Sequence, residues 1–182
     1  MRLNTTRWVS LLSLLLGSLF CSSSFAAMYL CIDGIKGDVT AQGYADCIAI
    51  DSFSDSLVRS FSQAGGGGGR EATLPSLSEI SLTKSLDSSS VELRKQAAIG
   101  KALNINIHFV QTGADSICEY YNVQLEDGIF SSHSMSNGAD QPYESFTINF
   151  TRIRYTLYQN DDKGCGSILT TWGWNVATGA PL

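Results

Sequence analysis

Apolar and polar residues alternate with a period of two along most of this 182-residue chain. In the stretch MYLCID, for example, Leu30 and Ile32 share one face and the residues between them share the other. Because successive side chains of a β-strand point to opposite faces of a sheet, the pattern predicts half-buried strands. The expected strands cover residues 28–33, 46–54, 77–84, 105–111, 118–127, 128–135, 144–159 and 166–176.

The expected strand 144–159 changes phase partway along. Its apolar residues recur every second position as far as Phe150, but the next one is Ile153, three residues later. Such a slip is typical of a β-bulge or of a strand buried on both faces.

One stretch, SSVELRKQAAIG, has helical character instead. Ser89 is the expected N-cap, and Glu92 three residues later completes a capping box. Val91 and Leu93 belong to the apolar stripe, and Gly100 is expected to end the helix. The pattern as a whole predicts a mainly β barrel or sandwich with a single flanking helix.

The N-terminus differs from the rest of the chain. Arg2 and Arg7 precede a run of uncharged, mostly apolar residues, and Ser24 and Ala26 supply small residues at the −3 and −1 positions of a cleavage site. This arrangement predicts that residues 1–26 are a secretory signal peptide. The apolar run is too short for a transmembrane helix, so no membrane insertion is expected.

Cleavage would leave residues 27–182 as one domain. The whole chain has a formal net charge of −5, and the leader removes two basic and no acidic residues, so the mature chain carries −7. An acidic chain without a basic cluster lacks the electrostatic features that attract nucleic acid or an anionic membrane.

Four cysteines remain after cleavage, namely Cys31, Cys47, Cys118 and Cys165. An even number in an exported chain suggests two disulfides, and free thiols are an equally weighted alternative. A hairpin centred near residue 39 would place Cys31 roughly opposite Cys47. That geometry favours a Cys31–Cys47 bond and leaves Cys118–Cys165 by elimination.

A run of five glycines interrupts residues 51–75. A phosphate-binding loop would need Lys-Ser or Lys-Thr after the last glycine, and Arg70 and Glu71 stand there instead. The residues before the run are too few for a separate domain, which argues against an interdomain linker. The segment 51–75 is therefore interpreted as a long functional loop.

Candidate catalytic chemistry is sparse. His108 lies in an alternating strand, and His133 lies among serines that could form a nucleophile–base pair with it, which leaves a hydrolase as a minor alternative. No nucleophile elbow accompanies His133, and no metal-ligand spacing occurs. Trp172 and Trp174 share a strand face, which fits core packing or a sugar-binding platform. We predict no enzyme, no cofactor and no metal.

Eight segments together resemble the haemolysin co-regulated protein (Hcp) family, the inner-tube proteins of type VI secretion systems. The resemblance extends from Met28 to about Ala177. The segments are YLCIDGIKGDVT (29–40), SFS (52–54), the glycines (65–69), ISLTKSLDSSSVEL (80–93), AAIGKAL (97–103), VQLEDGIFSS (123–132), ESFTINFTRIRYTLY (144–158) and GWN (173–175).

The resemblance implies a small β-barrel of two antiparallel sheets with one flanking α-helix. It also implies homo-hexameric rings that stack into a tube, with secretion spike proteins and small effectors in the lumen as partners and no catalysis. In the family the segment matching 51–73 is an extended loop that reaches a neighbouring ring or subunit. The expected assembly-loop residues are Ser60, Phe61, Gly65, Gly66, Gly67, Gly68, Gly69 and Arg70.

Three features distinguish the chain from typical members of the family: the leader, the four mature cysteines, and Asp55 in place of an aromatic residue. With the leader in use, the protein is expected to be periplasmic or secreted. If translation starts at Met28, it is expected to be cytoplasmic and then secreted by the type VI system. The alternative function is an exported monomeric, disulfide-stabilised binding module on the same fold.

Overall fold

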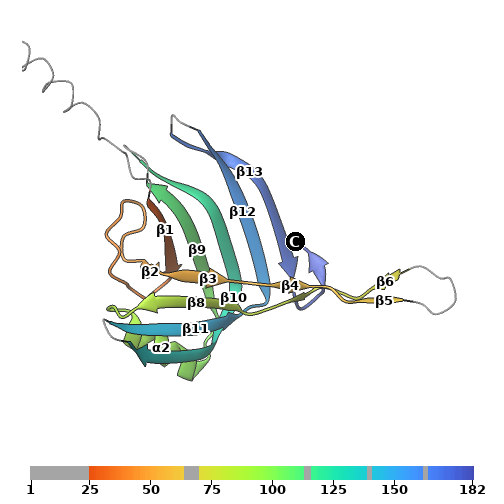
Figure 1. Cartoon of the computed structure of the whole chain (residues 1–182), viewed down its shortest axis with the longest axis horizontal. Helices are drawn as coiled ribbons and strands as arrows, with labels where there is room; N and C mark the ends of the chain where they lie inside the picture. The colour runs from red at the N-terminus through yellow and green to blue at the C-terminus, as the bar shows by residue number, and fades with distance from the viewer. Residues whose placement is uncertain (1–24, 64–69, 113–115, 139–140, 162–163) are drawn as a thin grey trace, which may run out of the picture.

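The computed structural model describes residues 25–63, 70–112, 116–138, 141–161 and 164–182. The fold is mainly β, as predicted, with one helix in the described ranges (Figure 1). The elements are β1 (Phe25–Ile32), β2 (Ile48–Ile50), β3 (Ser52–Ser54), β4 (Leu57–Val58), β5 (Phe61–Gln63), β6 (Arg70–Ala72), β7 (Ser76–Leu77), β8 (Ile80–Ser85), α2 (Ser90–Ile99), β9 (Leu103–Thr112), β10 (Ile117–Asn137), β11 (Pro142–Asn149), β12 (Arg152–Asp161), β13 (Gly164–Asn175) and β14 (Ala180–Pro181).

Two antiparallel layers share the long strand β10. Its first part pairs with β9 and β12 in a large layer that also contains β1, β2, β13 and β14. Its second part pairs with β11, which continues through β8 to β3 in a small layer. The strand changes direction at Asp127, whose φ is +54°, and Gly128, where a Cβ would lie 2.7 Å from Ile105 Cδ1. The sequence predicted two strands meeting here, and the structure has one bent strand.

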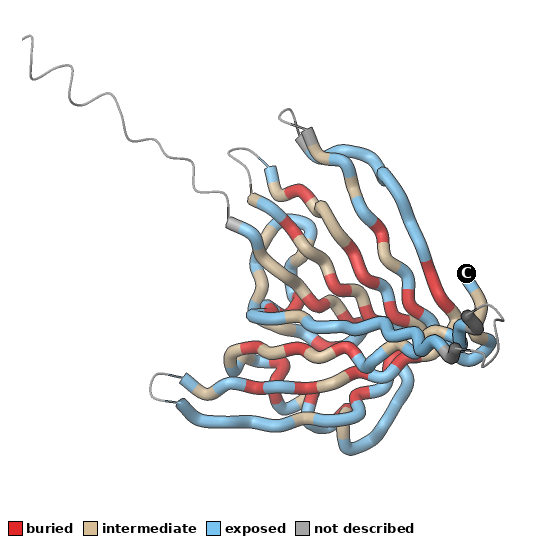
Figure 2. The backbone as a smooth tube through the Cα atoms, turned by 45° about the vertical axis from the view of Figure 1, so that its right-hand side comes forward, coloured by how far each residue is buried: buried red, intermediate tan, exposed pale blue. Residues whose placement is uncertain are grey.

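The core lies between the two layers. The residues that alternate inward from the large layer, such as Leu30 and Val123, meet Leu82 and Phe146 from the small layer, and all four are fully buried. Figure 2 shows the buried positions recurring along the strands where the layers face each other. The period-two pattern of the sequence is therefore the pattern of the core.

The predicted barrel does not close as a continuous sheet. β2 pairs with β1 and β3 pairs with β8, so the chain passes from one layer to the other at Asp51. This backbone connection closes the core between β2 of the large layer and β3 of the small layer. β12, β13 and β14 extend the large layer from β10 past the strands that the small layer covers, so this part of the large layer is open (Figure 1).

The phase slip marks a connection between layers. The expected strand 144–159 is two strands, β11 and β12, joined at Phe150 and Thr151. The backbone N–H of Thr151 donates to the Glu126 carbonyl at 3.1 Å, and Thr151 accepts from the Val176 N–H at 2.8 Å. Phe150 and Ile153 both remain in the core.

The helix begins and ends as expected but packs differently. Gly100 adopts a left-handed φ of +68°, and its N–H donates to the Gln96 carbonyl. Ser89 makes no side-chain capping bond, so the predicted capping box is not formed. Leu93 is buried, whereas Val91 is 80% exposed, so the expected apolar stripe is narrower than the sequence suggests.

Both disulfides expected from the sequence are present. Cys31–Cys47 joins β1 to the residue before β2, with Cα atoms 4.7 Å apart, and Cys118–Cys165 joins β10 to β13 at 4.9 Å. Of the predicted leader, only Phe25 and Ala26 lie in the described residues, where they pair with β9. Across the ranges that the structure describes, no helix has the length and apolar character needed to cross a membrane.

Candidate assembly surfaces

The segment predicted as an assembly loop forms a projecting hairpin. Its outward arm continues from β3 through β4 and β5, and its return arm contains β6 and β7 (Figure 1). Leu57 pairs with Leu77 and Phe61 pairs with Ala72. Between these ladders the Thr73 N–H donates to the Ser60 carbonyl at 3.0 Å. Ser60 and Phe61 therefore lie in the hairpin, as does the backbone of Arg70, and Gly65 to Gly69 lie outside the described residues.

The hairpin exposes apolar side chains along its length. Leu57, Val58, Phe61 and Leu74 are between 53% and 70% exposed. A two-stranded hairpin with no covering layer is only marginally stable in water. Exposed apolar residues on such an element are characteristic of a contact with another molecule.

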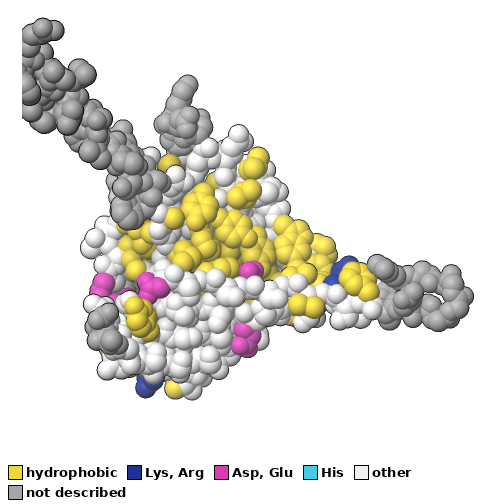
Figure 3. Space-filling model, viewed as in Figure 1, with side chains coloured by type: hydrophobic (Ala, Val, Ile, Leu, Met, Phe, Trp, Pro, Cys, Tyr) yellow, Lys and Arg dark blue, Asp and Glu magenta, His cyan; other side chains and the backbone are white. Residues whose placement is uncertain are grey.

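A second apolar surface lies on the large layer. The small layer covers only part of the inward-facing side, and the uncovered part shows as a continuous hydrophobic area beside β3 (Figure 3). These side chains are in phase with the core, because Tyr121 lies two residues before buried Val123 on β10. We name as the aromatic face the set Phe109, Tyr121, Tyr155, Leu157 and Trp172.

The rings of the aromatic face stack on one another. Tyr155 lies between Tyr121, at a centroid distance of 6.2 Å and an angle of 23°, and Trp172, at 5.8 Å and 16°. Trp172 in turn stacks on Trp174 at 6.1 Å, and Trp174 is buried in the core. A sugar platform needs ring faces that are free, whereas these faces are turned toward neighbouring rings. The arrangement therefore favours packing over sugar binding.

The base of the hairpin is fixed to the aromatic face by two contacts. Tyr155 donates its hydroxyl hydrogen to Asp55 Oδ2 at 2.7 Å. Burial, together with this bond and the charge of Asp55, raises the pKa of Tyr155 well above its usual value near 10. Phe53 packs edge-on against Phe109 with centroids 5.2 Å apart. Sequence reasoning noted that Asp55 stands where an aromatic residue is usual but did not predict its pairing with Tyr155.

His108 belongs to a polar cluster on the opposite side of the large layer. Its Nδ1 lies 2.6 Å from Glu119 Oε1, and the Asn122 amide donates to the same carboxylate at 2.9 Å. Tyr44 covers the imidazole at a centroid distance of 5.2 Å.

The environment of His133 does not fit a catalytic base. Its side chain is 2% exposed and stacks on Phe146, and neither ring nitrogen has a hydrogen-bond partner within the described residues. The nearby Ser134 hydroxyl donates instead to the Ser145 carbonyl. The serine–histidine pair considered from the sequence is therefore not assembled. No cluster of three potential metal ligands lies within the described ranges.

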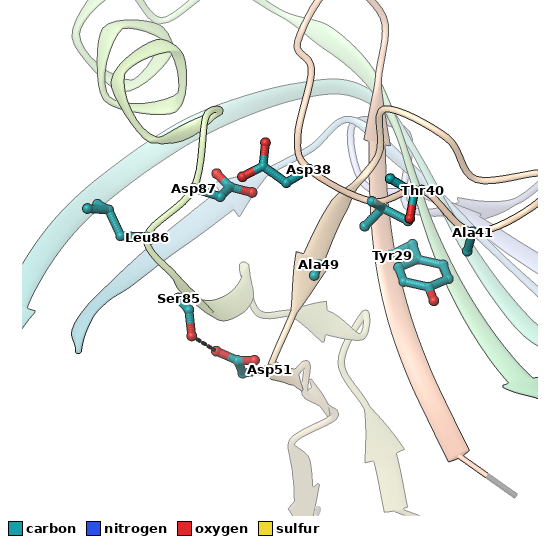
Figure 4. Close-up of a pocket in the computed structure, with 10 residues that line it drawn as sticks. Tyr29, Asp38, Thr40, Ala41, Ala49, Asp51, Ser85, Leu86 and Asp87 are labelled. Carbon is teal, nitrogen blue, oxygen red and sulfur yellow. Dashed lines mark hydrogen bonds between the residues drawn. The ribbon is translucent and has the colours of Figure 1, made fainter. Parts of the chain in front are cut away.

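A surface pocket of about 500 Å³ is lined by three carboxylates from Asp38, Asp51 and Asp87. Figure 4 shows these side chains entering it from the loop after β1, from the end of β2 and from the segment after β8. Each carboxylate has a partner in the protein, which reduces its capacity to bind a separate cation. The pairs are Ser88–Asp38 at 2.6 Å, Ser85–Asp51 at 3.2 Å and Lys84–Asp87 at 2.8 Å.

Fold and surfaces together define a two-layered β protein with two exposed apolar surfaces. A family model described as "Type VI secretion system effector, Hcp" matches residues 29–157. The chain belongs to this family, as its sequence resemblance indicated, and is a type VI secretion protein of the Hcp kind. Membership agrees with the expectation of a structural protein that is not an enzyme. No curated protein matches the chain.

Solved structures share the fold at low sequence identity. A type six secretion system protein superposes with a TM-score of 0.78 at 18% identity, covering 87% of this chain and 100% of that one. Hcp1 from Salmonella typhimurium gives 0.68 at 20% identity, with coverages of 86% and 99%. Hcp1 from the E. coli EAEC 042 pathovar gives 0.63 at 21% identity, with coverages of 82% and 97%.

Proposed function

We propose that the protein forms hexameric rings that stack into a tube, and that the hairpin of one copy packs on the aromatic face of the next. The observation that carries the proposal is that one chain has two unlike apolar surfaces, one projecting and one recessed. A contact between unlike surfaces is heterologous, so it closes into a ring or continues as a filament. Ring formation would cover both surfaces at once.

The glycines between β5 and β6 fit this role. A run of glycines has a large conformational entropy that must be lost when the loop becomes ordered. Contacts made in the oligomer would offset this cost, so that the tip of the loop orders on assembly. The proposed partners are other copies of the chain, with secretion spike proteins and small effectors as further partners of the assembled tube.

Export by the predicted leader is part of the proposal. The two disulfides support it, because such bonds persist in oxidising compartments and are rare in the cytosol. N-terminal sequencing of the native protein tests it. A sequence beginning at Ala27 is expected, whereas one beginning at Met28 would indicate internal initiation and a cytoplasmic tube subunit.

The assembly test compares two substitutions of exposed apolar residues. Phe61→Asp places a charge on the hairpin, and Val91→Asp places the same charge on the outer side of α2, away from both surfaces. Light scattering after size-exclusion chromatography is expected to give a hexamer for the unmodified mature chain and for Val91→Asp, and smaller species for Phe61→Asp. Equal behaviour of the two variants would contradict the assigned contact.

The alternative is a monomeric binding module on the same fold. The disulfides favour it to the extent that they stabilise the domain without a partner. An unmodified mature chain that stays monomeric at high concentration would support this alternative and exclude ring formation.

A further inference from the structure

The end of the β12–β13 hairpin extends past the strand that supports it. The ladder between β10 and β12 ends at the Tyr121–Leu157 pair, whereas β12 and β13 continue side by side beyond it (Figure 1). We name residues 158–161 and 164–168 the hairpin end. β14 pairs with β13 only from Trp174 onward, so within the described residues neither outer edge of the hairpin end belongs to a ladder. Such an element opens locally at a lower free energy than the core does.

Two contacts fasten the hairpin end to β10. The disulfide Cys118–Cys165 joins the start of β10 to the start of β13, with Cα atoms 4.9 Å apart. The Asn160 side chain donates from Nδ2 to the Glu119 carbonyl at 2.9 Å and accepts the Gly166 N–H at Oδ1, also at 2.9 Å. A neutral hydrogen bond contributes little net stability where water can replace it. Of the two contacts, the covalent bond is therefore the stronger link to β10.

The two sulfur atoms of this disulfide differ in their surroundings. Cys165 is an exposed residue, whereas Cys118 is 9% exposed. Because access to a sulfur controls the rate of thiol–disulfide exchange, Cys165 Sγ is the expected point of attack. The Ser116 hydroxyl lies 3.4 Å from Cys118 Sγ and is the donor, since a bonded sulfur carries no hydrogen. The same hydroxyl is placed to stabilise a thiolate that leaves from Cys118.

We propose that Cys118–Cys165 is a reducible clasp, which a dithiol reductant opens in the folded protein so that the hairpin end detaches from β10. One thiolate of the reductant bonds to Cys165 Sγ, and the electron pair of the broken S–S bond leaves on Cys118 Sγ, which takes up a proton. The second thiol of the reductant, as its thiolate, then displaces Cys165, which is protonated in turn. The reductant ends as an internal disulfide, and the protein gains two electrons and two protons.

The other disulfide, Cys31–Cys47, closes a loop that has further fastenings. The Gly37 N–H donates to the Asp46 carbonyl at 2.8 Å, and the Asp46 N–H donates to the Val39 carbonyl at 2.9 Å. These backbone bonds cross the loop and do not depend on the disulfide. Reduction of Cys31–Cys47 is therefore expected to leave the loop in place, which makes this bond an internal control for the clasp.

Opening of the clasp affects the aromatic face. Leu157 is the last residue of β12 that pairs with β10, and Tyr155 and Trp172 lie opposite each other on β12 and β13. Detachment of the hairpin end removes support from one side of these residues. Because disulfides persist in oxidising compartments and not in reducing ones, the surroundings of the protein would regulate this face. This consequence rests on the proposed function, whereas the clasp itself lies within one chain.

Reduction kinetics test whether the folded protein is attacked. The mature variant Cys31→Ala/Cys47→Ala keeps only the clasp, and mass spectrometry after alkylation measures its reduction by dithiothreitol. The rate is expected to rise in proportion to the dithiothreitol concentration, because Cys165 is exposed. A rate that levels off would overturn the proposal, because it would mean that reduction waits for the protein to unfold.

Amide exchange tests whether the hairpin end detaches. In the same variant, reduction is expected to speed exchange of the hairpin end at least about tenfold and to leave β9 unchanged. Unchanged exchange at the hairpin end would overturn the proposal. In the matched control Cys118→Ala/Cys165→Ala, reduction is expected to leave residues 37–46 protected. A loss there as large as that at the hairpin end would contradict the assignment of the clasp to one bond.

Two further arms separate this result from ring formation and from folding. The exchange comparison is repeated with Phe61→Asp added, because rings are not expected for that variant. The same response is expected there, whereas a response that disappears would mean that ring contacts, and not the clasp, order the hairpin end. If the cysteine variants do not fold, the unmodified mature chain gives both readouts, because alkylation identifies which bond has been reduced.

Discussion

The two disulfides close loops of different length, and this difference predicts how much each contributes to stability. Cys31 and Cys47 are 16 residues apart, whereas Cys118 and Cys165 are 47 apart. In the chain-entropy treatment, a bond stabilises the fold by restricting the unfolded chain, and the effect grows with the logarithm of the loop length. On this treatment the shorter loop contributes about 3 kcal/mol and the longer loop about 4 kcal/mol at 25 °C.

The perturbation is replacement of each pair by alanine, in one double variant per bond. Urea unfolding of the mature protein gives the free energy of unfolding, provided that all proteins are studied in the same oligomeric state. We expect both variants to be destabilised, with the Cys118→Ala/Cys165→Ala variant the less stable of the two by about 1 kcal/mol. A larger loss from the Cys31–Cys47 pair would refute the loop-length argument, and the absence of any loss in either variant would refute the bonds themselves.

Three further substitutions test individual contacts by the same urea unfolding. Lys84 and Glu144 form a fully buried ion pair at 2.9 Å, so Lys84→Met leaves the Glu144 carboxylate buried without its cation and is expected to lower the free energy of unfolding by about 3–5 kcal/mol. Adding Glu144→Gln should restore part of this stability, and a loss below about 1 kcal/mol in Lys84→Met would contradict the buried pair. Tyr155→Phe removes the bond to exposed Asp55 and is expected to cost about 1 kcal/mol, whereas no loss would mean that the bond does not hold the hairpin base. Gly100→Ala forces a Cβ into a left-handed φ of +68° and is expected to cost about 1–2 kcal/mol although the added atom meets nothing within 4 Å; equal stability would contradict that conformation.

The alternation of the sequence predicted most of the strands that enclose the core, but not the short strands β4 to β6, which lie in the segment interpreted as a loop. It works because one face of most strands packs in the core while the other face is mostly exposed or half-buried, so burial largely follows every second residue. It gave the disulfide pairing for the same reason, since Cys31 and Cys47 fall opposite each other on adjacent segments. The phase slip between Phe150 and Ile153 was also a real signal, but the chain changes layer there, and a slip alone does not distinguish a layer change from a bulge.

The features that sequence reasoning missed depend on contacts between distant segments. Asp55 meets Tyr155 across 100 residues, and nothing local to either residue specifies the other. The buried ion pair had a local signal that was not used. Lys84 continues the inward phase of Leu82, and Glu144 precedes inward Phe146 by two residues, so both charges were in core positions of the pattern. Opposite charges in such positions predict a pair.

The position of helix α2 was predicted correctly, but the hydrogen bonds at its N-terminus were not. A capping box is recognised by two residues at a fixed spacing, yet Glu92 is instead engaged with Lys95 and Gln96 along the helix. The turn before the helix is organised by Asp87, which accepts the Ser89 N–H at 2.9 Å. A polar network of this kind replaces the capping that the sequence motif implied.

The central claim is that one chain contains both halves of a head-to-tail contact. Negative-stain electron microscopy of the purified mature protein tests this claim most directly. The account predicts six-fold rings, with stacks of rings at high concentration, and isolated small particles for Phe61→Asp. A field of single domains from the unmodified protein at high concentration would contradict it.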